Sequence, residues 1–172
     1  MTPPRRVMII GGAGSGKSTL ARRIGARLGV PVYHMDREVF WLPGWAERPK
    51  DDQVRQVERI VGLDAWVFEG NNSSTFHLRE MRAELLIWID IPLLTRLVRV
   101  VRRNMVQRGD VRTDMADGCP EHLRMLPGFL WFILSTAHSG RAKQRAFFNT
   151  SAVPKVRARS SDDVNTVLET LT

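Results

Sequence analysis

The amino-acid sequence predicts an α/β fold of three layers, with a five-stranded parallel sheet between helices that cover both of its faces. Short apolar stretches alternate with segments in which apolar residues recur at helical spacing. This alternation is typical of parallel strands joined by helical crossovers. The first stretch lacks polar alternation, as expected for a strand buried on both faces. The five stretches lie at residues 5–10, 30–35, 66–68, 85–89 and 153–158.

The first strand is followed by a glycine-rich loop and by a helix predicted from about residue 16 to residue 28. Leu20, Ile24 and Leu28 recur every fourth residue and form one apolar face of this helix. Gly29 follows directly and is suited to end the helix, because glycine readily adopts the left-handed backbone found at helix C-termini.

Residues 36–50 follow the second strand and form an irregular segment with two tryptophans. Asp36 stands at the end of this strand, where ligands collect in open α/β sheets, and we expect it beside the glycine-rich loop. Trp41 and Trp45 flank a Pro-Gly pair, so they can stack on a planar ligand or cover an edge of the core. A helix is expected next, over residues 51–63.

The fourth strand ends at Asp90, and Pro92 separates it from a helix predicted to extend to about residue 107. The apolar residues of this helix predict a face packed on the core, whereas Arg96 and Arg99 are interpreted as part of a solvated basic face. The residues predicted to point inward are Leu94, Leu97, Val98, Val101 and Met105.

Residues 108–128 begin as a polar loop that contains Gly, Asp and Pro. A loop of this length in a compact α/β domain is usually functional. A long helix is predicted to follow, to about residue 148. Pro154 and the charged alternation around it place the fifth strand at an edge of the sheet. Ser161 is predicted to cap the last helix.

The loop after the first strand has the spacing of a phosphate-binding P-loop, in its proper place between a strand and a helix. Glycines let successive backbone N–H groups turn toward anionic oxygens, and the helix adds the positive end of its dipole. Lys17 is expected to reach the β and γ phosphates of ATP, and the Ser18 hydroxyl to bind Mg²⁺. The residues predicted to bind the nucleotide are Gly12, Ala13, Gly14, Ser15, Gly16, Lys17, Ser18 and Thr19.

The 172 residues are predicted to form a single domain, 1–172, with an ordinary hydrophobic fraction of 43% and a charged fraction of 26%. Cys119 is the only cysteine, which excludes an internal disulfide and fits a reducing compartment. Neither a signal peptide nor an apolar stretch of bilayer length is recognised, so a cytoplasmic protein is expected. The net charge of +8 favours anionic partners without choosing among nucleotides, nucleic acid and acidic surfaces.

Several further stretches of the chain match one family of proteins. They are Gly11–Ser18, Pro31–Asp36, Trp41–Trp45, Glu69–Asn71, and the run from Arg108-Gly109 through Asp114-Met115-Ala116 to Gly118–Glu121. With these residues the chain resembles the nucleoside and nucleotide kinases, and more closely the adenylate-kinase-related family labelled "topology modulation protein". The resemblance covers about residues 5–160. It implies a P-loop NTPase fold with strand order 2-3-1-4-5, an acceptor-binding segment at residues 36–50 and an arginine-bearing lid at residues 108–128.

The chain departs from adenylate-type kinases after the third strand. Those kinases have Asp-Gly-Phe-Pro-Arg at this point, and the arginine holds the phosphate of the acceptor. The matching residues here are Glu69-Gly70-Asn71-Asn72-Ser73, so the arginine is missing. Burying a phosphate without a cationic partner is costly, so a nucleoside monophosphate is predicted to be a poor acceptor. The arginines that would fill the gap are Arg37, Arg48 and Arg79.

Phosphoryl transfer needs positioning and neutralisation of charge more than covalent chemistry from the protein. A carboxylate at a strand end is expected to hold Mg²⁺ together with Ser18. Glu69 and Asp90 both fit, and Glu69 is preferred because the resemblance places the third strand beside the first. Asp36 is assigned to accept a proton from an acceptor hydroxyl or to assist the metal, with a structural turn aspartate as the alternative. His34 is interpreted as structural.

Arginines near the lid are assigned to phosphate oxygens, which guanidinium groups bind in bidentate geometry. Arg103 precedes the lid, and Arg108 and Arg112 lie in it. The sequence thus predicts an ATP- and Mg²⁺-dependent kinase that acts on an unidentified small molecule. The alternative is a nucleotide-binding regulatory protein associated with DNA and without kinase turnover. It is not favoured, because the sequence has no recognised nucleic-acid module and no continuous Lys/Arg tract.

Overall fold

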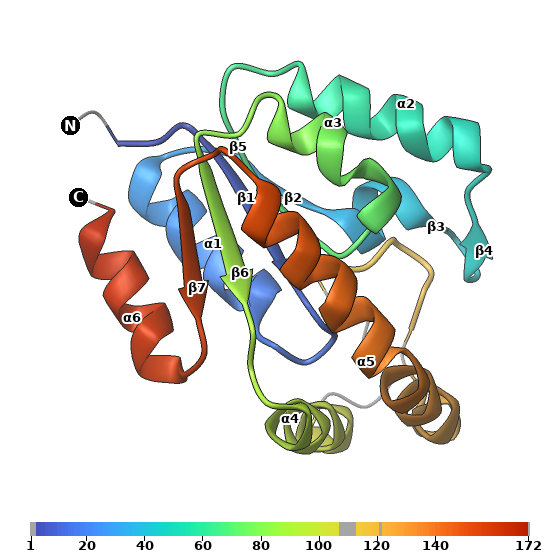
Figure 1. Cartoon of the computed structure of the whole chain (residues 1–172). Coiled ribbons are helices and arrows are strands. Elements are labelled where there is room, and N and C mark those ends of the chain that lie inside the picture. Colours follow the sequence, from blue (N-terminus) through green and yellow to red (C-terminus); the bar gives the residue numbers. More distant parts are fainter. Residues whose placement is uncertain (1–2, 107–112, 121, 172) are drawn as a thin grey trace.

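A computed structural model describes residues 3–106, 113–120 and 122–171 of the chain. Its main sheet has five strands, all parallel, in the order β2-β5-β1-β6-β7 (Figure 1). Numbered among themselves along the chain, these strands have the order 2-3-1-4-5, so the predicted topology is confirmed. Their bounds are Arg6–Gly11 for β1, Val32–His34 for β2, Trp66–Glu69 for β5, Leu85–Ile89 for β6 and Lys155–Ala158 for β7.

Helices cover both faces of the sheet, as predicted. Helices α1 and α6 pack on one face, and α2, α3 and α5 pack on the other (Figure 1). Helix α4 lies beyond the carboxyl end of β6, close to the loop after β1. The bounds are Lys17–Leu28 for α1, Lys50–Val61 for α2, Phe76–Glu80 for α3, Leu93–Val106 for α4, Leu126–Thr150 for α5 and Ser161–Thr170 for α6, with short 3₁₀ turns at Ser73–Thr75 and Leu123–Met125.

The central strand β1 shows why the sequence predicts a sheet buried on both faces. Val7 and Ile9 belong to the core under α1 and α6, whereas Met8 and Ile10 belong to the core under α2 and α5. All four side chains are fully buried. Burying each such side chain stabilises the fold by about 1.5–3 kcal/mol, so this strand joins two separate apolar layers. The carboxyl end of the strand then delivers the glycine-rich loop to one edge of the sheet.

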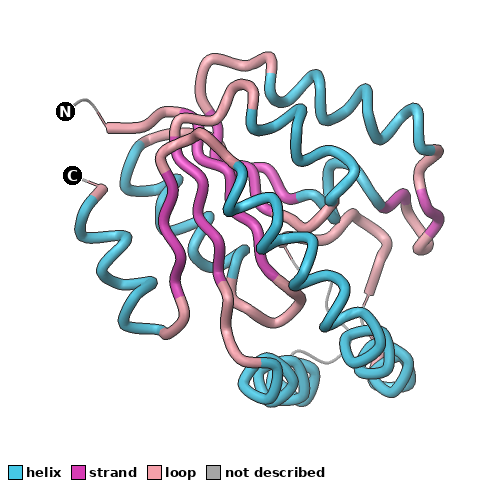
Figure 2. Tube along the Cα trace, in the orientation of Figure 1, coloured by secondary structure: helices cyan, strands magenta, loops and turns pink. Residues whose placement is uncertain are grey.

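Residues 36–50 are more regular than the sequence suggests. A π-helical turn, Asp36–Phe40, leads into a small antiparallel hairpin of β3 (Trp41–Leu42) and β4 (Ala46–Glu47). Figure 2 shows this hairpin apart from the main sheet. The two tryptophan rings flanking the hairpin turn, Trp41 and Trp45, pack edge to face with their centroids 5.4 Å apart.

The hairpin is fastened to the segment that follows residue 112. The backbone N–H of Gly44 donates to the carbonyl of Gly118 over 3.0 Å. The buried thiol of Cys119 donates to the carbonyl of Leu42, and its sulfur accepts from the backbone N–H of Trp45. Cys119 therefore joins two segments that the sequence assigns to different parts of the site.

Helix α4 packs in the opposite sense to the prediction. Three of the residues expected to face inward are exposed: Leu94 by 74%, Val98 by 59% and Met105 by 60%. The side of the helix that is buried carries Arg96, together with Val100 and Asn104. The interpretation of Arg96 as a solvated residue is therefore wrong, and its partners are described with the site. No helix in the described ranges is long and apolar enough to cross a membrane.

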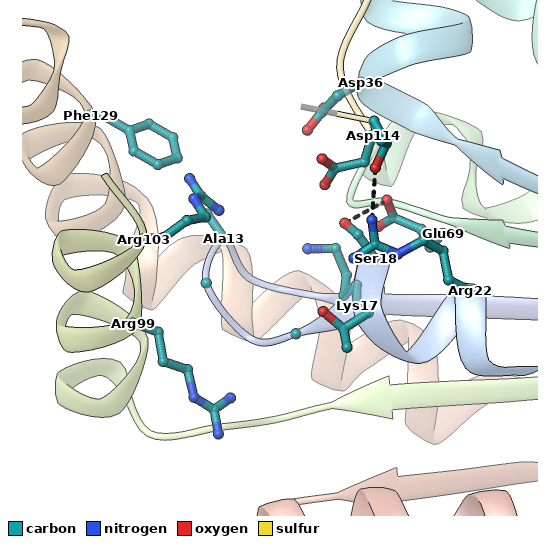
Figure 3. Close-up of a pocket in the computed structure, with 14 residues that line it drawn as sticks. Ala13, Lys17, Ser18, Arg22, Asp36, Glu69, Arg99, Arg103, Asp114 and Phe129 are labelled. Carbon is teal, nitrogen blue, oxygen red and sulfur yellow. Dashed lines mark hydrogen bonds between the residues drawn. The ribbon is translucent and has the colours of Figure 1, made fainter. Parts of the chain in front are cut away.

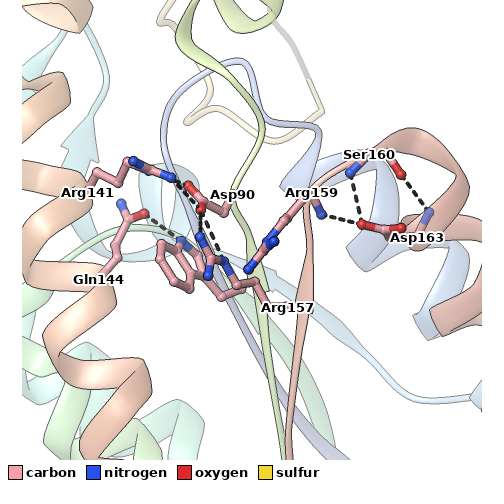
Figure 4. Close-up of polar contacts among 8 residues, drawn as sticks. Asp90, Arg141, Gln144, Arg157, Arg159, Ser160 and Asp163 are labelled. Carbon is pink, nitrogen blue, oxygen red and sulfur yellow. Dashed lines mark hydrogen bonds and ion pairs between the residues drawn. The ribbon is translucent and has the colours of Figure 1, made fainter.

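Asp90 directly follows β6, and its buried carboxylate is the centre of an ionic cluster, as Figure 4 shows. Its carboxylate accepts two hydrogen bonds from Arg141 of α5, at 2.7 and 2.9 Å, and two from Arg157 of β7. The Arg157 guanidinium also lies over the Trp88 ring, whose N–H donates to Gln144 of α5. Asp90 thus links two strands and a helix through arginines, which agrees with the preference for Glu69 as the Mg²⁺ candidate.

The cap of the last helix lies one residue earlier than predicted. Ser160, and not Ser161, accepts from the backbone N–H of Asp163, and the Asp163 carboxylate accepts from the backbone N–H of Ser160. This reciprocal capping box satisfies two N–H groups at once and is visible in Figure 4. The capping role passes to Ser160 because its extended backbone places its hydroxyl opposite the third residue of the helix.

We predict that Asp90→Asn lowers the free energy of unfolding by about 2–3 kcal/mol at pH 7, because it leaves two arginines without their carboxylate. Hydrogen bonds from Arg141 and Arg157 outweigh the effect of burial and lower the pKa of Asp90. Its stabilisation is therefore present above the unfolded-state pKa of about 3.9 and is lost as pH falls through the lower folded pKa. Urea unfolding at pH 7 and in acid is the measurement.

The exposed Asp64→Asn variant is the matched control and is expected to unfold like the wild type. The wild type and Asp90→Asn are expected to converge in stability in acid. An Asp90→Asn protein as stable as Asp64→Asn at pH 7 would contradict the assigned role of the cluster.

Candidate active site

The loop between β1 and α1 has the backbone of a phosphate-binding loop. Gly14 and Gly16 have φ angles of 76° and 98°, which side-chain-bearing residues rarely adopt. Gly16 occupies the position before α1, and no side chain caps the helix there. The first N–H groups of α1 thus stay available to an anion, and the helix dipole favours one. Lys17 reaches back across the loop and donates to the carbonyl of Gly12 over 3.2 Å.

Helix α4 holds this loop from outside. Arg96 donates from Nε to the carbonyl of Ala13 over 2.8 Å, and Arg99 donates from Nη1 to the carbonyl of Ser15 over 3.1 Å. A Cβ atom at Gly12 would lie 2.3 Å from Cζ of Arg96, and one at Gly14 would lie 2.6 Å from the Arg96 carbonyl oxygen. Glycine is therefore required at position 14 by the backbone of α4 as well as by its own backbone shape, whereas a side chain at position 12 would displace the end of the Arg96 side chain.

Glu69 joins the loop to the second strand. Its Oε1 accepts from the Ser18 hydroxyl over 3.0 Å and lies 2.8 Å from Nδ1 of His34. His34 and Glu69 are paired in the register of β2 and β5, which explains the contact. Burial by itself raises the pKa of Glu69, but the hydrogen bond from His34 and the charge of Lys17 outweigh it and lower that pKa. Glu69 is therefore a carboxylate at neutral pH.

A cavity of about 820 Å³ opens in front of the loop (Figure 3). In the figure, Asp36 and Asp114 lie on one side of this cavity and Arg103 and Phe129 on the other. Thr113 links the first side to α1 and to the π-helical turn, because its hydroxyl accepts from Arg22 and its carbonyl accepts from Arg37. The charged residues of the lining are Lys17, Arg22, Asp36, Glu69, Arg99, Arg103 and Asp114.

Most residues proposed from the sequence meet in this cavity. Ser15 does not line it, since it is buried behind the loop, and Gly12 lines a smaller cavity on the other side. Arg108 and Arg112 lie outside the described residues. The predicted residues that do line the cavity are Ala13, Gly14, Gly16, Lys17, Ser18, Thr19, Asp36, Glu69 and Arg103.

Sequence reasoning missed five residues that line the cavity: Arg22, Arg99, Thr113, Asp114 and Phe129. Arg22 follows Ser18 by one turn of α1, and this spacing could have pointed to it. The other four come from helices and loops whose packing the sequence does not reveal. His34 is buried, as expected of a structural residue, but it holds Glu69 and so belongs to the site.

The arginines considered for an acceptor phosphate are engaged elsewhere. Arg79 is fully buried and donates to the carbonyls of Gly70 and Asn72, so the idea that it replaces the missing arginine is wrong. Its guanidinium is drawn into the loop after β5 because those carbonyls need donors in the core. Arg48 donates to the carbonyl of Val39.

The residues of the loop fit a nucleoside triphosphate with Mg²⁺. Mg²⁺ keeps several waters and takes few protein ligands, for which a hydroxyl beside an ionised carboxylate is suitable. Ser18 and Glu69 supply this pair. The described residues contain no cluster of three or more His, Cys, Asp or Glu that would hold a metal alone, so the nucleotide oxygens would complete the coordination.

The sheet topology and the loop together give the chain the α/β fold of P-loop kinases. Shikimate kinase from Aquifex aeolicus has a TM-score of 0.56 at 17% identity, covering 96% of this chain and 95% of its own. For shikimate kinase from Bacteroides thetaiotaomicron the values are 0.58 and 13%, covering 98% and 96%. A sugar kinase from Janibacter sp. HTCC2649 has a TM-score of 0.53 at 14% identity, covering 98% and 90%. At these identities the likeness concerns the fold.

Sequence comparison gives a shorter match. Shikimate kinase from Buchnera aphidicola is 29% identical over 83 residues, which are 48% of this chain. The match spans only 38% of the length of that relative. No protein-family model matches the chain. These comparisons agree with the broader resemblance to P-loop kinases.

We predict that Gly14→Ala lowers the free energy of unfolding by at least about 2 kcal/mol, from backbone strain and overpacking against α4. The control is Gly128→Ala in α5, where a Cβ meets nothing within 4 Å. That variant is expected to gain up to about 1 kcal/mol from helix propensity. Thermal and urea unfolding measure both. Equal stability of the two variants would contradict the close packing of α4 on the loop.

Proposed function

We propose that the protein is an ATP- and Mg²⁺-dependent phosphotransferase that acts on a hydroxyl group of a small molecule. One observation carries this proposal: the phosphate loop, Lys17, the Ser18–Glu69 pair and Asp36 all border a single cavity. The similarity to shikimate and sugar kinases supports a hydroxyl acceptor. A cavity of about 820 Å³ has room for a nucleotide and a small partner together.

Each side chain then has a role in positioning or in charge neutralisation. The loop N–H groups and Lys17 would bind the donor phosphates, with Arg99 and Arg103 beside them. Mg²⁺, when bound, would neutralise phosphate charge. Ser18 and Glu69 would hold the ion, and His34 fixes the orientation of the Glu69 carboxylate.

Asp36 is the candidate general base. It is exposed and lines the cavity at the carboxyl end of β2, so it would accept the proton of an acceptor hydroxyl aligned with the γ phosphate. The acceptor would lie against residues 36–50, and a nucleoside monophosphate is expected to be a poor one. The narrower resemblance to the "topology modulation protein" family remains part of this proposal.

A DNA-associated regulatory role rests mainly on the net charge, and the positions of the arginines do not favour it. Arg79 and Arg96 are buried, and Arg141 and Arg157 share the Asp90 carboxylate. These four cations are buried or paired within the protein, which leaves them less accessible to a nucleic-acid backbone.

We expect Lys17→Ala to weaken MgATP binding about tenfold or more, because it removes a charged partner of the phosphates. Isothermal titration calorimetry is the measurement. Arg27→Ala, in the last turn of the same helix and exposed, is the control and should bind as the wild type does. Unchanged affinity in a folded Lys17→Ala protein would exclude the assigned role of this lysine.

In the presence of an alcohol that the protein phosphorylates, we expect Asp36→Asn to lower the rate of ADP formation by about 100-fold or more. The reason is that general-base catalysis contributes a rate factor of about 10²–10⁴. The affinity of this variant for ATP should stay within about twofold of wild type, because a base for the acceptor adds nothing to donor binding. The exposed Asp51→Asn variant is the control. Screening of alcohols, nucleosides and nucleotides identifies the acceptor; rapid phosphorylation of AMP would overturn the acceptor assignment.

A further inference from the structure

A second, smaller cavity of about 120 Å³ lies on the other side of the phosphate loop. It is lined by the loop, the end of β6, Arg96 of α4, the middle of α5 and Asn71 after β5. Ala13 lines both this cavity and the larger one, so the two adjoin at the loop. The proposed roles of donor and metal-binding residues make no use of this space. Its polar lining consists of Asn71, Asp90, Arg96, Thr136, Arg141 and Gln144.

Positive charge exceeds negative charge around this cavity. The Asp90 carboxylate is shared between Arg141 and Arg157. Arg96 also lines the cavity, but it makes no hydrogen bond to Asp90 in the described part of the chain. Three guanidinium groups therefore gather around one carboxylate.

Arg96 has unused hydrogen-bonding capacity that faces this space. Only 8% of the residue is exposed, and its Nε donates to the carbonyl of Ala13. Its two terminal nitrogens have no acceptor among the described residues, yet they are not among the atoms sealed from solvent. Both nitrogens belong to the Arg96 guanidinium group, which lies against Gly12 and borders the cavity.

A buried cation without a bonded counter-ion is costly, and burial lowers the pKa of Arg96 despite the nearby charge of Asp90. An anion in the cavity would supply the missing acceptors for Arg96. The volume, about four times the ~30 Å³ share of one water molecule, suits a carboxylate or phosphate group and excludes a whole nucleotide. Guanidinium groups bind such anions through paired hydrogen bonds.

We propose that this cavity is an anion subsite, and that it holds the carboxylate or phosphate group of the acceptor while the acceptor hydroxyl lies in the larger cavity. The assignment of this subsite to the acceptor rests on the proposed function, whereas the anion subsite itself does not. Arg96 and Arg141, from α4 and α5, would then supply the cationic contacts to this anionic group.

Crystals soaked in sodium selenate test the subsite directly, because anomalous scattering from selenium locates the anion. Soaks with and without ADP separate the cavity from the phosphate loop. We expect a selenium peak within hydrogen-bond distance of Arg96 and Arg141 that persists when ADP fills the loop. Selenate found only at the loop, or nowhere, overturns the proposal.

Ala137→Leu fills the cavity without changing its charges, since Ala137 lines it from α5. Ala142→Leu, an exposed substitution on the same helix outside the lining, is the matched control. The selenium peak should vanish in the first variant and remain in the second, with unfolding temperatures measured for both. A peak that survives Ala137→Leu identifies an adventitious ion only and overturns the subsite.

Kinetics with an anionic acceptor test the assignment of the subsite to the acceptor. Ala137→Leu should raise the KM for that acceptor at least about tenfold and leave the KM for ATP unchanged, as expected for loss of a charge-assisted contact. An esterified, uncharged form of the acceptor should react equally poorly with the wild type and with Ala137→Leu, because it has no charge for the subsite to bind. A selenium peak combined with an unchanged acceptor KM leaves an anion site and overturns the acceptor assignment. Failure to find any phosphorylated acceptor would count against the proposed function and would leave the selenate result standing.

Discussion

A phosphate loop can present its N–H groups to a ligand only if its carbonyl groups find partners on the opposite side. In this protein helix α4 supplies them. Arg96 binds the carbonyl of Ala13, and Arg99 binds that of Ser15. The helix approaches so closely that a Cβ atom at Gly14 would meet its backbone, and one at Gly12 would meet the Arg96 guanidinium. The orientation of α4, the shape of the loop and the two cavities on either side of it all depend on this contact.

Two strand-end carboxylates flank the loop strand and show how partners determine roles. β5 and β6 both pair with β1, so Glu69 and Asp90 emerge on either side of it. Asp90 is bound by two arginines and links β6, β7 and α5. Glu69 instead accepts from Ser18 and His34 and borders the larger cavity. Chemically similar carboxylates are thus assigned to structure and to ligand binding by the hydrogen-bond donors around them.

The sequence predicts the sheet, its layers and the phosphate loop, because these follow from contiguous patterns: apolar strands, helical spacing and a glycine motif. The carboxyl ends of the strands also locate Asp36 and Glu69 at the cavity. The predicted orientation of helix α4 is wrong because the helix carries both an apolar stripe and an arginine stripe. Periodicity predicts that the apolar stripe is buried, whereas the carbonyls of the phosphate loop need hydrogen-bond donors and therefore require the arginine stripe to face them. His34 depends on strand register, which no local pattern reveals.

The contact between Gly12 and Arg96 has a consequence for how related chains can diverge. A side chain at position 12 would occupy the space of the guanidinium, so it requires either that the end of the Arg96 side chain moves or that position 96 holds a smaller residue. Although the two positions are 84 residues apart, they are coupled by this contact. In related chains that keep this packing, their identities should covary.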